Sequence, residues 1–133
     1  MFSSYKYSDL TGKIIGCAMQ VHRILGNSFQ EVIYQRALAI ELAEKGILFE
    51  REKEIPVYYK GHVVGSRRPD FIVETKICIE LKALTFLENS HSYQAKGYLE
   101  AYKLELGLLI NFGAESLEFK RIYNNKFNVD QKI

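Results

Sequence analysis

Three residues in the middle of the chain have the types and spacing to bind a metal ion and activate water. Asp70 follows Pro69, and Glu80 and Lys82 lie two positions apart in the run Ile-Glu-Leu-Lys. Alternate side chains of a β-strand point to the same face, so Glu80 and Lys82 would share one. If residues 74–76 form a tight turn, paired residue numbers sum to about 150, which places Asp70 opposite Glu80 or one pair away. The spacing therefore predicts two carboxylates and an ammonium group on one face of a β-hairpin.

Two carboxylates at that separation repel each other, and a hard divalent cation would relieve the repulsion. Mg²⁺ is commonly held by one or two carboxylates together with water and phosphate oxygens, so Mg²⁺ or Mn²⁺ is the expected cofactor. Lys82 could then orient or deprotonate a water, or stabilise charge on a phosphate. Glu-x-Lys is by itself a common pattern of solvated strand faces, and Pro-Asp is common in turns. Only their combination in one predicted hairpin favours a site.

Two helices are expected ahead of these strands. The first covers residues 10–25 and is capped by Ser8 or Asp9, and the second covers residues 29–45 and ends at Gly46. The first has one buried face, formed by Ile14, Ala18, Val21 and Leu25. The second is apolar on two nearly opposite sides, which is typical of a helix packed between layers. Its stripes are Phe29, Val32, Ile33, Ala37 and Ile40 on one side, and Tyr34, Leu38 and Leu42 on the other.

A three-stranded meander is predicted next. Strands are expected over residues 47–59, with a bend at Pro56, and over residues 63–73 and 77–83, joined by turns at 60–62 and 74–76. A helix over residues 91–103 with Ser90 as its cap, a buried strand over 107–112 and a weak final element over 117–122 follow. This order predicts an α/β fold in which a mixed sheet, containing an antiparallel meander, is flanked by helices.

Two of the helices are expected to add side chains to the site. Glu31 projects with the Tyr34 stripe, so it lies either at the rim or buried for a purpose. Because an unpaired charge among apolar side chains is costly, we expect Glu31 to be buried and to point into the site. Gln94 and Tyr98 are four residues apart and share one helix face, although half-exposed helix faces commonly look the same.

The composition fits one domain over residues 1–133. No apolar run approaches the ~20 residues of a membrane span, and the start of the chain has no apolar signal segment. Cys17 and Cys78 sit inside apolar patterns, so a reduced cytoplasmic protein is the expectation. The net charge of +2 is too small for nucleic-acid binding by bulk charge. Phosphate contacts must then come from a local group such as Arg67, Arg68, Lys82 and Lys96.

The histidines and a tyrosine pair are weaker candidates. His22 lies near an apolar helix face and is expected to be structural, and His62 is expected to be solvated in a turn. His91 could approach the site from the start of the helix that carries Gln94. The tyrosines at 58–59 could stack on bases, although tyrosines on strands more often pack across the sheet.

These residues occur in the order of a known pattern. Asp70, then Glu80 and Lys82, then Gln94 and Tyr98 resemble the PD-(D/E)XK nuclease superfamily in its RecB-like arrangement. More closely, the chain resembles the small bacterial GxxExxY proteins. The stretches that carry this likeness are residues 28–34, 68–70, 79–82, 91–94 and 108–113. One departure is Ser28, which stands where the name motif has glycine and which could serve as an N-cap.

The resemblance implies a restriction-endonuclease-like core and a role for each matching residue. Asp70, Glu80 and Glu31 would be the metal ligands, with Glu31 borne on a helix. Lys82 would activate water, and Gln94 would orient the nucleophile or Lys82. Substrate contacts are expected from Arg68, Lys96 and Tyr98.

The leading hypothesis is a metal-dependent nuclease that hydrolyses phosphodiester bonds, with DNA favoured as substrate. A second hypothesis is a nucleic-acid-binding or regulatory module that keeps the fold with little turnover. A third is a small interaction protein that works as a homodimer or within a larger complex. Fold resemblance alone does not separate these hypotheses.

Overall fold

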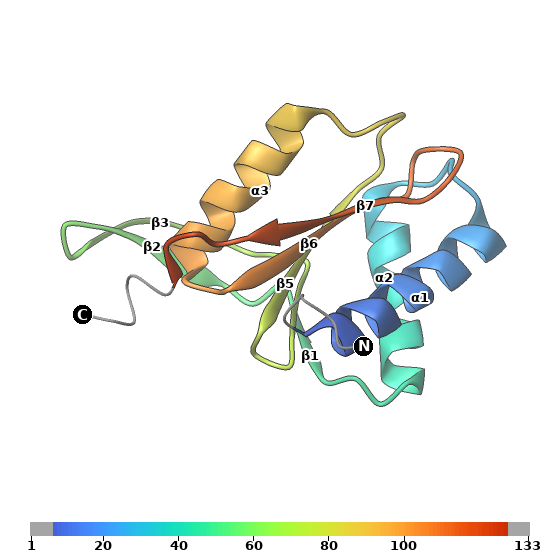
Figure 1. Cartoon of the computed structure of the whole chain (residues 1–133), viewed down its shortest axis with the longest axis horizontal. Coiled ribbons are helices and arrows are strands. Elements are labelled where there is room, and N and C mark those ends of the chain that lie inside the picture. Colours follow the sequence, from blue (N-terminus) through green and yellow to red (C-terminus); the bar gives the residue numbers. More distant parts are fainter. Residues whose placement is uncertain (1–6, 128–133) are drawn as a thin grey trace, which may run out of the picture.

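A computed structural model describes residues 7–127 of the chain (Figure 1). Two helices come first, then a run of strands, a third helix and two closing strands. The helices are α1 (Ser8–Leu25), α2 (Glu31–Glu44) and α3 (Asn89–Tyr102). The strands are β1 (Phe49–Arg51), β2 (Ile55–Tyr59), β3 (His62–Arg67), β4 (Phe71–Val73), β5 (Ile77–Lys82), β6 (Leu106–Asn111) and β7 (Glu118–Tyr123).

The main sheet is the middle of three layers. It has the strand order β1-β4-β5-β6-β7, in which β5 and β6 run parallel and the other neighbours run antiparallel. Helices α1 and α2 pack on one face of the sheet and α3 packs on the other (Figure 1). One apolar core lies under α1 and α2, and a second lies under α3. This arrangement confirms the predicted mixed sheet with an antiparallel meander flanked by helices.

Helix α2 buries only one of its two apolar stripes, so the expectation of a helix packed between layers is wrong. Tyr34, Leu38 and Leu42 are fully buried, whereas Val32 and Ile40 are 40% and 60% exposed. A helix on the outside of a layered fold needs one buried stripe, and its other side faces solvent.

The predicted N-terminal helix caps are wrong, whereas Gly46 follows the end of α2 with a positive φ, as predicted. The residues expected as caps were Ser8 or Asp9, Ser28 and Ser90. The helices are preceded instead by Tyr7, Gln30 and Glu88. Among the helices that the structure describes, only α3 has a reciprocal capping box, formed by Glu88 and His91. Helices α1 and α2 thus depend on packing rather than on side-chain caps for their starting points.

Both long strands predicted in the meander are interrupted. Residues 47–59 divide into β1 and β2, and residues 63–73 divide into β3 and β4. The second break falls at Pro69, which has no N–H to donate to a ladder. Strands β2 and β3 therefore pair only with each other, as a hairpin that extends past one end of α3 (Figure 1). Its predicted turn is confirmed at Lys60 and Gly61, which both have positive φ.

The turn between β4 and β5 sets the register of the site. Glu74 and Thr75 have φ of 52° and 59°, as a tight hairpin turn requires. The strands pair as Phe71 with Ile79, Ile72 with Cys78 and Val73 with Ile77, so the predicted register is confirmed. Continuing this register by one residue brings Asp70 level with Glu80.

Thr75→Gly is expected to stabilise the protein by about 0.5–1 kcal/mol. A β-branched residue is strained at positive φ and glycine is not, although glycine loses more backbone entropy on folding. The measurement is the urea midpoint at constant m-value. Thr85→Gly is the matched control, because Thr85 is an exposed loop residue without positive φ. Equal destabilisation by the two changes would contradict the prediction.

The weak final element is a full strand, β7, antiparallel to β6. Cys17 and Cys78 are both buried free thiols. Among the helices within residues 7–127, none is long and apolar enough to cross a membrane.

Candidate active site

A small pocket between β5 and α3 brings together several of the predicted site residues. Glu80 and Lys82 are the partly exposed positions of β5, whose other residues are buried, and both point toward α3. Gln94 and Tyr98, one helical turn apart, line the pocket from α3. The hollow measures about 20 Å³, which is room for about one water molecule. Its other lining residues are Arg67, His91, Ala95 and Leu109.

Asp70 lies just beyond the β4–β5 ladder and does not itself line this pocket. One of its carboxylate oxygens accepts a hydrogen bond from the Leu81 N–H (2.8 Å), and the other accepts from the side-chain amide of Gln35 (2.7 Å). The first bond satisfies a β5 N–H on the side of β4, at a position that the β4–β5 ladder does not reach. Together the two donors hold the carboxylate in a fixed orientation.

The carboxyl groups of Asp70 and Glu80 are close enough to repel each other. Burial, reinforced by the charge of Asp70, raises the pKa of Glu80 to about 7, against the opposing effects of Arg67 and Lys82. Burial also raises the pKa of Asp70, although its two hydrogen bonds act in the opposite direction. Carboxyl groups with raised pKa values in a hollow are a recurrent property of active sites.

Glu31 is solvent-exposed at the start of α2, which corrects the expectation that it is buried. Its carboxyl group is still near the site, because partial desolvation and the charge of Asp70 raise its pKa while Lys82 lowers it. Gln35 lies one helical turn further along α2 and donates to Asp70. This face of α2 is therefore directed at Asp70, with Glu31 at the solvent rim.

Arg67, rather than the predicted Arg68, lies at the pocket. Its guanidinium sits over the ring of Tyr98, 3.7 Å from the ring centroid, in a cation–π contact. Arg68 is exposed and lies 3.8 Å from Glu54. Successive residues of an extended chain point in opposite directions, which separates the two arginines. Lys96 is half-buried on α3 and does not line the pocket.

The three histidines occupy different settings. The Nε2 atom of His22 lies 2.9 Å from the Ala114 carbonyl oxygen, as a structural histidine would. His62 is exposed and begins β3, directly after the hairpin turn. His91 lines the pocket beside Glu80 and Lys82.

The loop that leaves β5 is held by the side chain of Asn111, which is fully buried. Its Oδ1 accepts from the Leu84 N–H (2.8 Å), and its Nδ2 donates to the Leu84 carbonyl (2.9 Å) and to Glu118 (2.9 Å). Glu118 also accepts from the Leu87 N–H, close to the start of α3. At Gly113 a Cβ atom would come within 2.4 Å of the Leu84 backbone, so only glycine fits. These contacts fix how Lys82 and α3 lie relative to each other.

Tyr34 holds the start of α2 in place. Its hydroxyl donates to the Gly26 carbonyl (2.7 Å) and accepts from the Phe29 N–H (3.1 Å). Its ring stacks on Phe112 at 4.6 Å between centroids. Because Gln35 is the next residue, these contacts also direct Gln35 toward Asp70.

The donor set fits a hard divalent cation with few protein ligands. Within residues 7–127 no group of three or more His, Cys, Asp or Glu side chains forms a cage for a metal ion. Asp70 and Glu80 instead offer two oxygen ligands, which suit a Mg²⁺-type ion that keeps several waters. The raised pKa of Glu80 agrees with this, because a positive ion would relieve the repulsion that raises it.

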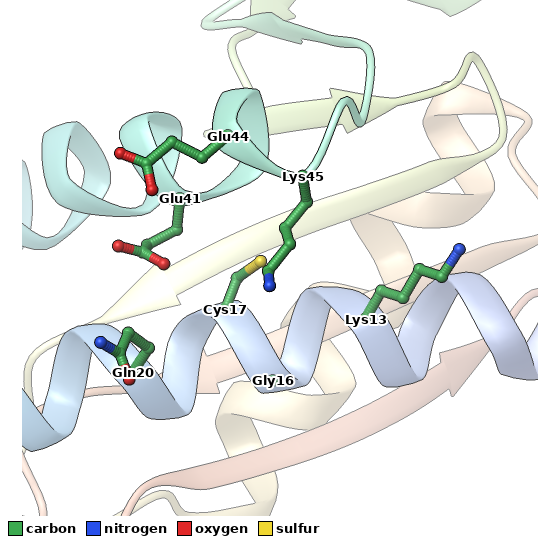
Figure 2. Close-up of a pocket in the computed structure, with 7 residues that line it drawn as sticks. All are labelled: Lys13, Gly16, Cys17, Gln20, Glu41, Glu44 and Lys45. Atoms are coloured by element: carbon green, nitrogen blue, oxygen red, sulfur yellow. The ribbon is translucent and has the colours of Figure 1, made fainter.

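A larger groove lies between α1 and α2 (Figure 2). Its walls carry Lys13 and Lys45 alongside Glu41 and Glu44, around the sulfur of Cys17. Mixed charges on exposed helix surfaces are the ordinary solvated case. Burial raises the pKa of the Cys17 thiol, which disfavours the reactive thiolate. The groove thus offers less chemistry than the pocket at Glu80.

Comparison with protein families agrees with this geometry. A family model described as the PD-(D/E)XK nuclease superfamily matches residues 8–122. The chain belongs to the PD-(D/E)XK nuclease superfamily. The matched range begins in α1 and ends in β7, so it contains the whole pocket. A comparison with curated proteins gives no match.

Two solved structures resemble this member of the PD-(D/E)XK superfamily in fold. The crystal structure of SSO0001 aligns with a TM-score of 0.58 and 17% identity, over 95% of this chain and 66% of that one. An alkaline exonuclease from Laribacter hongkongensis, LHK-Exo, aligns with a TM-score of 0.52 and 11% identity, over 96% of this chain and 75% of that one. This chain thus spans slightly less than two thirds of the first protein. At these identities the likeness establishes the fold.

Two residues that build the site of this PD-(D/E)XK chain, Gln35 and Asn111, were not expected from the sequence. Gln35 had a usable signal, because it lies one helical turn after Glu31 on the same face. Asn111 also had one, as a polar residue in the apolar run of β6. Arg67 was expected only as a member of a basic group with Arg68, because the choice between the two arginines depends on where β3 leaves the main sheet.

Proposed function

We propose that this protein is a metal-dependent nuclease that hydrolyses phosphodiester bonds, with DNA as the favoured substrate. The observation that carries the proposal is the pocket in which Glu80, Lys82 and Gln94 meet beside Asp70, in a chain of the PD-(D/E)XK nuclease superfamily. The shared fold of an alkaline exonuclease is a second support. Mg²⁺ or Mn²⁺ is the proposed cofactor, held by Asp70 and Glu80 with charge support from Glu31.

The proposed mechanism assigns a task to each side chain. A bound divalent cation would supply positive charge to the phosphate and make a bound water more acidic. Lys82, in the same hollow as Glu80, orients the attacking water and stabilises negative charge. Gln94 offers an amide to orient that water or Lys82, in a space that holds about one water molecule. Arg67, which is held over the ring of Tyr98, supplies a second positive charge for the substrate backbone.

Within the superfamily, we assign the chain to the GxxExxY group. Glu31 and Tyr34 stand at the group's named positions, with Ser28 in place of glycine. The hydroxyl and ring contacts of Tyr34 support a structural role for the tyrosine. The two buried free thiols support a reduced, cytoplasmic setting.

Asp70→Asn is the direct test of the metal site. We expect it to weaken Mg²⁺ and Mn²⁺ binding at least about tenfold and to slow DNA cleavage by about 10²–10⁴-fold, because a charged ligand is lost. The fold should persist, since asparagine can still accept from the Leu81 N–H, and the Gln35 amide can turn to accept from it. Binding is measured by calorimetry, and cleavage on single- and double-stranded DNA and on RNA.

Asp9→Asn is the matched control, since Asp9 is exposed on α1. Equal cation affinity of wild type and Asp70→Asn would refute the metal site. Nucleic-acid binding without turnover would favour the second hypothesis, a binding or regulatory module. Cleavage of RNA but not of DNA would support the proposed nuclease activity and would show that RNA is the substrate.

A further inference from the structure

His91 is an unusual residue type at the third position of a helix capping box. It is the third residue of α3, and its Nδ1 atom accepts a hydrogen bond from the Glu88 N–H (3.0 Å). Glu or Gln usually makes this reciprocal contact in a capping box. An imidazole does the same work with one ring nitrogen and leaves the other nitrogen available.

The capping bond also determines whether the other ring nitrogen, Nε2, is a hydrogen-bond donor or an acceptor. Because Nδ1 is an acceptor here, the proton of the neutral imidazole must be on Nε2, which is then a donor. The ring lines the pocket together with Glu80, Lys82 and Gln94. Within residues 7–127, no hydrogen-bond acceptor is assigned to Nε2.

Charge explains why histidine suits this position better than glutamate. The pocket already contains the carboxyl group of Glu80, with Asp70 beside it. A glutamate at 91 would cap the helix but would add a further negative charge where a phosphate has to approach. Histidine caps the helix and presents a donor instead.

We propose that His91 is a substrate-binding residue whose Nε2–H donates to an oxygen of the nucleic-acid phosphate. This inference rests on the proposed function and goes beyond it, because it assigns the phosphate a protein donor on α3. A hydrogen bond from a preoriented neutral donor to a phosphate is strong enough to change affinity about tenfold or more.

The test compares His91→Glu with His91→Gln in the full chain. Both side chains can cap α3, but only glutamine keeps a donor, so the pair separates phosphate binding from capping. The probe is a fluorescent DNA oligonucleotide, with affinity measured by anisotropy in Ca²⁺ and cleavage measured in Mg²⁺. Ser90→Glu is the control, because it adds the same charge at an exposed neighbouring position outside the capping box.

We expect His91→Glu to weaken DNA binding about 10- to 100-fold, His91→Gln to stay within about threefold of wild type, and Ser90→Glu to have a smaller effect than His91→Glu. Melting temperatures of both His91 variants should stay near that of wild type. If wild type binds and cleaves DNA and both variants match it, the role of His91 is refuted while the nuclease proposal stands. Equal loss of DNA affinity in both variants, together with lowered melting temperatures, would also refute the role of His91. The loss would then come from disruption of the helix cap. A wild type that neither binds nor cleaves DNA or RNA would overturn both proposals.

Discussion

Replacing Glu80 with glutamine should raise the free energy of unfolding of the metal-free protein by about 1–3 kcal/mol at pH 8. The pKa of Glu80 is raised to about 7 by burial and by Asp70. Between pH 4.5 and 7 the folded protein therefore keeps a proton that the unfolded chain has released, so wild-type stability falls as pH rises. Each unit of pKa corresponds to about 1.4 kcal/mol. Glutamine has no charge to desolvate, and it fills the same space.

The gain from Glu80→Gln should shrink as the pH falls toward 4.5 and vanish below it, because only below its ordinary pKa of 4.5 is the wild-type carboxyl group protonated in both states. Urea unfolding at pH 5 and pH 8, without divalent cations, measures this difference. Glu115→Gln is the control, because Glu115 is exposed. A Glu80→Gln protein that is clearly less stable than wild type at pH 8 would show that Glu80 is a structural partner of Lys82 or Arg67.

The same substitution should have the opposite effect on function. Losing the Glu80 charge removes a proposed metal ligand, and we expect cleavage to fall by about 10³-fold. Added Mg²⁺ should raise the melting temperature of wild type and hardly change that of Glu80→Gln. A stabilising change that abolishes activity would mark Glu80 as a residue kept for chemistry at a cost in stability.

Asn111→Asp should be the most destabilising of these substitutions, by about 3–5 kcal/mol at pH 7. The new carboxylate would be fully buried, and it would face the Leu84 carbonyl and the Glu118 carboxylate, which now accept hydrogen bonds from the amide. Breaking a buried network in this way leaves an uncompensated charge. The loss should shrink toward pH 4, where the introduced group takes up a proton.

Thermal and urea unfolding at pH 7 and pH 4 measure this effect, with Asn125→Asp as the matched control on the surface. Because the amide fixes the loop between β5 and α3, cleavage should also fall even where the variant is still folded. A variant of near wild-type stability would mean that the loop is held mainly by other contacts.

The part of the site that depends on turn geometry, strand alternation and helical spacing was predictable from the sequence. The β4–β5 register follows from one tight turn and strand alternation, which together place Asp70 level with Glu80. Gln94 and Tyr98 follow from helical spacing. Arg67 and Gln35 depend on where the chain leaves the sheet and how α2 docks, and both are settled by long-range packing. The exposure of Glu31 was mispredicted for the same reason. The apolar stripe of α2 does not show which of its residues lie at the solvent-exposed end of the helix.

The parallel pairing of β5 with β6 has a consequence for how this protein folds. Ile77 pairs with Leu106, so the whole of α3 is enclosed in the loop that this pair closes. The β4–β5 hairpin can form early, but closing the longer loop costs chain entropy before its contacts contribute, which slows folding. Asp70 and Glu80 can therefore meet in a local hairpin, whereas Gln94 and His91 reach them through contacts that span a longer stretch of chain. We therefore expect the complete site to form after the hairpin, and a fragment that contains the hairpin alone would carry the acidic pair without its α3 partners.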